Sequence, residues 1–253
     1  MAEVLPTRRH FFITKPLLCN MFVTGANKGI GLEICRQLAS KGVLVVLTAR
    51  DEERGLEAVK SLRVSGFSDV VFHQLDVMDE LSIASFANFI RNQFGRLDIL
   101  VNNAGIAGTE IKEDDWKKLR FGDEDASLSN CLRTNYYGIK HLTEALIPIL
   151  ERSNSARIVN VSSSLGKLKY IPSEKTKKIL GDVDVLTEEK VEELVEEFLE
   201  DFKNDLLETK RWPTFFQLIL CPRPLKMPTQ GFWRRSTPKS QSMQFVLVLL
   251  ART

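Results

Sequence analysis

The sequence predicts an α/β protein of the Rossmann type, with a doubly wound parallel sheet and helices on both faces. Two observations lead to this fold class. Between Leu17 and Ser163, apolar strand-like runs alternate with amphipathic helical stretches, as in chains built from βαβ units. In addition, the glycine-rich turn TGANKGIG at 24–31 directly follows the first run and opens the first helical pattern.

The expected elements follow one another in a regular order. In the first helix Ile30, Ile34 and Leu38 lie on one face, and Gly42 is a candidate C-cap. The next strand is apolar throughout, as expected when helices cover both faces of a sheet. Strands are expected to end at Val23 and to cover 43–48, 70–75, 97–101 and 157–161, and later helices to cover 51–62, 79–94 and 126–150.

The chain divides into three regions. We expect residues 1–17 to be an atypical N-terminal extension and 18–215 to form the Rossmann domain. Within that domain, 165–211 is a helical insertion, in which apolar residues from Val191 to Leu206 follow helical spacing. Residues 216–253 lose the strand–helix alternation, and five prolines occur between Pro213 and Pro238. We expect this tail to be aberrant and disordered, lacking the last strands of the sheet, with an aggregation-prone run at 245–251.

The composition excludes several other classes. The chain has 253 residues, of which 43% are hydrophobic and 27% charged, with a net charge of +2. These values suit one soluble domain and give no support for nucleic acid or membrane as partner. Four scattered cysteines indicate reduced thiols in the cytoplasm, and Lys15 interrupts the only candidate leader. His73 and His141 lack paired ligands, which favours structural roles over a metal site.

Small and polar residues gather at the carboxyl end of each predicted strand. In a doubly wound sheet these ends form the ligand crevice, and glycines let the backbone approach a pyrophosphate at a helix N-terminus. Turn formation alone does not easily explain five such positions. They are Thr24-Gly25, Ala49-Arg50, Asp76-Val77, Asn102-Asn103-Ala104-Gly105 and Ser162-Ser163-Ser164.

Two cations favour NADPH over NADH. Arg50 stands at the end of the second strand, where NAD-specific sites usually carry an acid, and Lys28 lies in the glycine-rich turn. Both can pair with a 2′-phosphate, and Arg50 can do so with two hydrogen bonds. The alternative is a surface salt bridge from Arg50 to Asp51 or Glu52.

The combined motifs resemble the short-chain dehydrogenase/reductase family. They are TGANKGIG, LDV at 75–77, NNAG at 102–105, TNYYG at 134–138 and RIVNVSS at 157–163. The resemblance covers about residues 20–214 and is strongest to the plant carbonyl-reductase-like branch, which includes menthol dehydrogenases and salutaridine reductase. It implies NADP(H) as cofactor, and a ketone, aldehyde or alcohol substrate of terpenoid or alkaloid type. The insertion before Trp212 resembles the one that keeps this branch monomeric.

The resemblance also assigns roles to residues. Gly25, Gly29 and Gly31 would hold the pyrophosphate, Asp76 would bind the adenine and Val77 would flank it. Asn135 would hold a water in the proton relay and Ser163 the substrate carbonyl, with Ser162 and Ser164 supporting that turn. The full cofactor set is Thr24, Gly25, Asn27, Lys28, Gly29, Ile30, Gly31, Arg50, Asp76, Val77, Asn103, Ala104 and Gly105.

The family's proton-donating motif, Tyr-x-x-x-Lys, is absent where the resemblance places it, shortly after Trp212. The only tyrosines are Tyr136, Tyr137 and Tyr170, and Tyr170 has Glu174 four residues on. We therefore expect the chain to be inactive, since this acid–base step typically contributes roughly 100- to 10,000-fold.

The genetic code suggests how the motif was lost. Read in the frame that starts at the third base of the Gln217 codon, the permitted codons give Ala-Tyr-x-x-Ser-Lys-Ala, and near Leu247 they give Ile-Asn-Ala-Val-Cys-Pro-Gly. These are the family's catalytic helix and next strand, in order. The hypothesis is a frame shift close to Phe215 or Phe216. Two readings stay open: an NADPH-dependent oxidoreductase by family, or a non-catalytic NADP-binding remnant or non-functional product of a frame-shifted gene.

Overall fold

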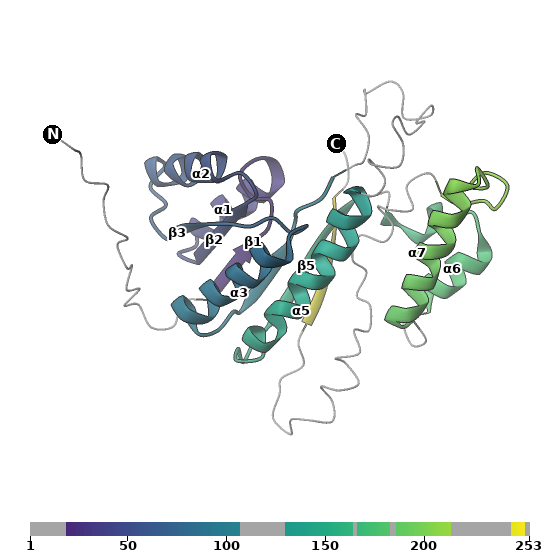
Figure 1. Cartoon of the computed structure of the whole chain (residues 1–253). Helices are drawn as coiled ribbons and strands as arrows, with labels where there is room; N and C mark the ends of the chain where they lie inside the picture. The colour runs from purple at the N-terminus through teal and green to yellow at the C-terminus, as the bar shows by residue number, and fades with distance from the viewer. Residues whose placement is uncertain (1–18, 107–129, 164–165, 183–185, 214–243, 251–253) are drawn as a thin grey trace.

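The computed structural model describes residues 19–106, 130–163, 166–182, 186–213 and 244–250. Its centre is a six-stranded sheet of order β3-β2-β1-β4-β5-β6 (Figure 1). All neighbouring strands are parallel. This is the strand order of dinucleotide-binding α/β folds, so the predicted fold class is confirmed. The strands are β1 (Asn20–Val23), β2 (Leu44–Ala49), β3 (Val70–Gln74), β4 (Ile99–Asn102), β5 (Arg157–Ser163) and β6 (Gln244–Leu250).

Helices cover both faces of the sheet (Figure 1). On one face lie α1 (Gly29–Ala39) and α2 (Glu52–Val64), and on the other α3 (Glu80–Phe94) and α5 (Gly138–Leu150). A π-helix, η1 (Arg133–Tyr137), leads directly into α5. The insertion contributes the 3-10 helix η3 (Leu168–Tyr170), α6 (Glu174–Gly181) and α7 (Glu188–Lys203).

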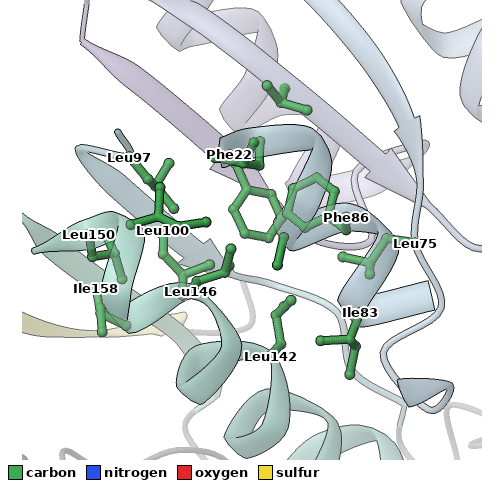
Figure 2. Packing of buried hydrophobic residues seen from close by; sticks show 14 of the residues in the cluster. Phe22, Leu75, Ile83, Phe86, Leu97, Leu100, Leu142, Leu146, Leu150 and Ile158 are labelled. Carbon is green, nitrogen blue, oxygen red and sulfur yellow. The ribbon is translucent and has the colours of Figure 1, made fainter. Parts of the chain in front are cut away.

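Alternation along the central strands divides the core into two layers. In β1, Phe22 packs with α3 and α5, whereas its neighbour Val23 packs with α1 and α2. Figure 2 shows the first layer, where the rings of Phe22 and Phe86 lie with centroids 4.5 Å apart. Because both faces of these strands are buried, β2 has no exposed residue, as its apolar sequence predicts.

Helix caps explain why the predicted boundaries of α2 and α3 hold to within two residues, whereas the helix predicted over 126–150 is α5 only from Gly138 and is preceded by η1. Asp51 accepts a hydrogen bond from Arg54 N at 3.0 Å and starts α2. Asp79 accepts one from Leu81 N at 3.0 Å and starts α3. Gly95 then ends α3 in the left-handed conformation, with φ of 72°. These are the residue types that satisfy the free backbone groups at helix ends.

Two details of the first helix differ from expectation. α1 ends at Ala39 with Ser40 as its C-cap, and Gly42 follows two residues later with φ of +73°. Ile30 does not share the burial of Ile34 and Leu38, since it is 50% exposed. The reason is its place in the first turn of α1, at the rim of the sheet.

The prediction of a disordered tail is wrong for residues 244–250. Their backbone forms β6, which pairs in parallel with β5 from Arg157↔Gln244 to Ser163↔Leu250. A physical reason is available in the sequence QFVLVLL, which is rich in residues with high β-propensity and free of proline and glycine. Such a run can pair with the free backbone N–H and C=O groups of an edge strand, even when its sequence departs from the family pattern. The rest of the tail, 214–243, lies outside the described residues.

The insertion contains two α-helices where one was predicted. α7 carries the apolar stripe that the spacing indicated, and Val191, Leu194, Val195 and Phe198 are buried. The sequence does not predict α6, because EKTKKILG has few apolar residues. Trp212 closes the cluster: its Nε1 donates to Asp201 Oδ2 at 2.8 Å, and its ring lies edge-on to Phe198.

Candidate cofactor site

The glycine-rich turn lies at the carboxyl end of β1, against the loop that follows β4. Gly25 has φ of +58°, and a Cβ there would lie 2.9 Å from Ala104 Cα. A Cβ at Gly31 would lie 2.5 Å from Asn103 Nδ2 and 2.7 Å from Gly25 O. Both positions therefore exclude a side chain, and the two loops pack backbone to backbone. This junction of β1 and β4 is where the strand order reverses, the place at which doubly wound folds bind ligands.

A hydrogen-bond network fixes the two loops to each other. The buried hydroxyl of Thr24 accepts from Asn103 N at 2.8 Å and from Ala104 N at 2.7 Å. In return, Asn103 Nδ2 donates to Thr24 O at 2.9 Å and to Gly25 O at 3.1 Å. The network holds the rim in one shape before any ligand arrives.

The N-terminus of α1 is open toward this rim. Lys28 is the N-cap residue and supplies no side-chain cap, and the first turn contains no acidic residue. A Cβ at Gly29 would meet no atom within 4 Å. Uncapped N–H groups and the positive end of the helix dipole favour an anion, and no acid competes for that place.

Lys28 and Arg50 are both exposed, and within the described residues neither forms an ion pair. The salt bridge considered as the alternative role of Arg50 is not formed, since Asp51 caps α2 and pairs with Arg54 Nε at 3.6 Å. The backbone of Arg50 is held by Gln74, whose Nε2 donates to Arg50 O at 2.9 Å. The guanidinium is therefore available to a ligand from a fixed position at the end of β2.

Asp76 and Val77 follow the end of β3. Asp76 Oδ1 accepts from Met78 N at 2.9 Å, and Asp76 N donates to Ser82 Oγ at 2.9 Å. Within the described residues, Asp76 Oδ2 has no hydrogen-bond partner and can accept one from a ligand. Val77 is buried against the start of α5, because a Cβ at Gly138 would lie 2.7 Å from Val77 O.

Asn135 lies in the π-helix and binds the loop that carries NNAG. Its Oδ1 accepts from Ile106 N at 2.9 Å, and its Nδ2 donates to Ile106 O at 2.8 Å. Cys131, one turn earlier, donates its Sγ–H to the same carbonyl at 3.2 Å. No pattern in the sequence predicts this π-turn, a local widening of a helix that is frequent at functional sites. The amide thus positions the backbone next to Gly105; its role in a water relay stays a prediction.

Ser163 ends β5 at the same edge of the sheet as the glycine-rich turn. Ser162 is buried beside it, and Ser164 lies outside the described residues. Below them in the sheet, Asn102 Nδ2 donates to Asn160 Oδ1 at 2.8 Å and ties β4 to β5. The structure therefore brings the predicted substrate-side serine to the rim of the cofactor-side strands.

One Tyr-x-x-x-Lys spacing does occur in the chain, from Tyr136 to Lys140, but it lies far before the position at which the resemblance places the catalytic pair. Tyr136 is 3% exposed, and its hydroxyl has no hydrogen-bond partner among the described residues. Burial raises its pKa. Lys140 Nζ is held by Glu188 and by Glu192 Oε1, the latter at 2.6 Å. A buried phenol of raised pKa whose lysine is already paired is a poor proton donor.

His73 and His141 pack against aromatic rings, as expected for structural residues. His73 packs against Phe89 and Phe86, with ring centroids 4.5 and 5.2 Å away, and burial lowers its pKa. His141 lies 6.2 Å from the ring of Tyr137. In the part of the chain that the structure describes, no group of three or more potential metal ligands occurs. Over the same residues, none of the helices has the length and apolarity needed to cross a bilayer.

The sequence profile described as short chain dehydrogenase matches residues 20–175, which include every strand from β1 to β5. The chain is a member of the short-chain dehydrogenase family. Salutaridine reductase of Papaver bracteatum is 49% identical over 216 residues, covering 76% of this chain and 70% of that protein. Carbonyl reductase [NADPH] 1 of Bos taurus is 40% identical over 198 residues, covering 77% and 67%.

A solved structure extends the likeness to three dimensions. Menthone neomenthol reductase from Mentha piperita superimposes with a TM-score of 0.73 at 42% identity, covering 81% of each chain. The short-chain dehydrogenase is thus similar to plant reductases of salutaridine and menthone type, as its motifs predicted.

Proposed function

We propose that this short-chain dehydrogenase binds NADP(H) at the rim formed by β1, β2 and β4 but does not reduce a carbonyl. The observation that carries the proposal is the pair of exposed cations Lys28 and Arg50, which form no ion pair within the described residues, beside a helix N-terminus without a side-chain cap. A 2′-phosphate would find both charges there, and NADH would not use them. The relative named carbonyl reductase [NADPH] supports the same preference.

The described residues fit such a cofactor. Gly25, Gly29 and Gly31 leave the backbone bare at the helix N-terminus, where a pyrophosphate can approach. Asp76 Oδ2 can accept from the adenine amino group, and Val77 can flank the ring. Asn103, Ala104 and Gly105 would line the nicotinamide side. When bound, the nicotinamide supplies a hydride for a carbonyl carbon.

The chemistry that this chain's own residues can add is incomplete. Ser163 would donate a hydrogen bond to the carbonyl oxygen of a small ketone or aldehyde, or to an alcohol in the reverse direction. A proton donor beside that oxygen is also required, and Tyr136 and Lys140 are engaged with the insertion instead. We therefore expect binding without turnover.

Fluorescence titration of the purified full chain with NADPH and NADH tests the binding half of this proposal. Saturable NADPH binding that is tighter than NADH binding supports it, and the absence of binding removes it. A panel of terpenoid and alkaloid-like ketones, followed by NADPH oxidation, tests the second half. Turnover above background would show that another group supplies the proton.

The second candidate, a non-functional product of a frame-shifted gene, is favoured by the alternative reading frame after Gln217. Sequencing the transcript across codons 205–225 decides it. An intact frame that encodes FFQLILCPRP from unrelated codons would contradict the shift. A monomer in the cytoplasm is expected in either case, and sedimentation at a mass near 28.8 kDa would agree with it.

A further inference from the structure

The insertion packs against one face of the helical segment 132–140. Leu132, Tyr136 and Lys140 recur at intervals of four residues and face α7 and its cluster. Leu132 and Tyr136 are buried with Val191, Leu194 and Phe198. The helix α7 is therefore packed against the helical segment in which Asn135 lies, although α7 begins 53 residues later in the sequence (188 − 135).

Lys140 adds two ion pairs to this contact. Its Nζ binds Glu188 and Glu192 in the first two turns of α7, and its side chain is 17% exposed. Both acids lie on α7, so the pairing fixes where that helix begins relative to η1 and α5. Because the pair is only partly exposed, water and salt screen it less than a surface ion pair.

The neighbouring side of the same segment holds the loop after β4. Asn135 binds both the N–H and the C=O of Ile106, and Cys131 donates a second hydrogen bond to that carbonyl. Ile106 follows Gly105, whose Cβ position lies 3.3 Å from Asn135 Oδ1. From Ile106 the chain runs back through NNAG to the bonds between Asn103 and Thr24. Any shift of the π-turn therefore moves the nicotinamide side of the rim.

We infer that Lys140 is a positioning residue for the nicotinamide side of the cofactor site, acting through the π-turn and Asn135. The insertion then has a role besides covering surface: it holds η1 in the one arrangement that presents Gly105 and Ile106 correctly. The adenine side depends on Lys28, Arg50 and Asp76, which form no hydrogen bond or ion pair with the insertion among the described residues. This inference rests on the proposed binding of NADP(H).

The test compares two ligands on the full chain. NADPH spans both sides of the site, whereas adenosine 2′,5′-bisphosphate occupies only the adenine side. With Lys140→Gln, we expect the affinity for NADPH to fall about five- to tenfold and that for the bisphosphate to stay within about twofold. Glu188→Gln with Glu192→Gln breaks the same pair from α7 and should give the same split. Lys140→Arg keeps the charge and should restore NADPH binding.

Each outcome has a distinct meaning. If both variants bind the two ligands as the wild type does, the inference is wrong. Equal weakening for both ligands also overturns it, because a general loss of folding would produce that result. Lys177→Gln, which breaks the exposed Lys177–Glu174 pair within α6, is the matched control and should change neither affinity. A wild-type chain that binds neither ligand refutes the proposed function itself, before any variant is compared.

Discussion

The rim at β1 and β4 and the edge strand β6 differ in how far their structure depends on particular side chains. At the rim, the backbones of Gly25 and Gly31 leave no room for a Cβ, and Thr24 makes bonds that few residues could replace. At β6, seven residues from a segment that departs from the family pattern still pair in register with β5. Strand pairing uses the backbone, which every residue has, whereas a binding site needs particular side chains in particular places.

The largest effect is expected from Gly25→Val. The new side chain would meet Ala104 within 3 Å, and a branched residue at φ of +58° is strained by about 1–3 kcal/mol. We expect NADPH affinity to fall at least about 100-fold, measured by fluorescence titration, together with a lower melting temperature. Gly42→Ala is the control: its φ is +73° but its Cβ would meet nothing within 4 Å. Should Gly42→Ala lose binding equally, the close packing at the rim would not be the cause.

Arg50→Ala should have the next largest effect. Loss of a charge-assisted bond to the 2′-phosphate is worth about 1.5–3 kcal/mol, so the affinity for NADPH should fall roughly 10- to 100-fold. The affinity for NADH should hardly change, because NADH lacks that phosphate. Arg54→Ala removes a nearby exposed cation that pairs with Asp51 and should leave both affinities alone. Equal losses for NADPH and NADH would assign Arg50 a different role.

Removing β6 by ending the chain after Ser242 tests the other half of the comparison. We expect a lower melting temperature, because β5 loses its outer partner over seven residues. NADPH affinity should stay within about twofold, since the rim lies at β1, β2 and β4. Thermal denaturation and the same titration measure the two quantities. A chain that folds but no longer binds NADPH would show that the edge strand supports the site.

The smallest effect concerns pH. Burial among Phe86 and Phe89 lowers the pKa of His73 from about 6.5, so the unfolded chain binds the proton more tightly than the folded one. The stability that neutral His73 contributes is present above the unfolded pKa of about 6.5 and is lost as pH falls through the lower folded pKa. Urea denaturation near pH 7.5 and near pH 5.5 should show a smaller difference for His73→Gln than for the wild type. An unchanged difference would assign the pH dependence to other groups.

Much of this structure could be predicted, because the signals are local. The apolar run ending at Val23, the caps Asp51 and Asp79 and the stripe on α7 each follow from a few adjacent residues. The meeting of Thr24 with Asn103 also follows, since both stand at carboxyl ends of parallel strands. For the same reason, the sequence alone predicted that Arg50 lies at the rim.

The rest depends on partners that are distant in the sequence. The bond from Asn135 to Ile106 and the pairing of Lys140 with Glu188 and Glu192 join positions 29 to 52 residues apart. No periodicity indicates such pairs, so the partners of Asn135 and Lys140 could not be predicted from the sequence. β6 was missed for a different reason: its sequence departs from the family, but its β-propensity remained.

The central claim is that the rim for a phosphorylated dinucleotide is intact while the proton donor is lost. Titration of the purified chain with NADPH, followed by addition of ketones to the same sample, tests it most directly. We predict saturable binding, weaker binding of NADH, and no oxidation of NADPH by any ketone. An unchanged fluorescence signal on adding NADPH would contradict the first part, and steady consumption of NADPH with a ketone would contradict the second.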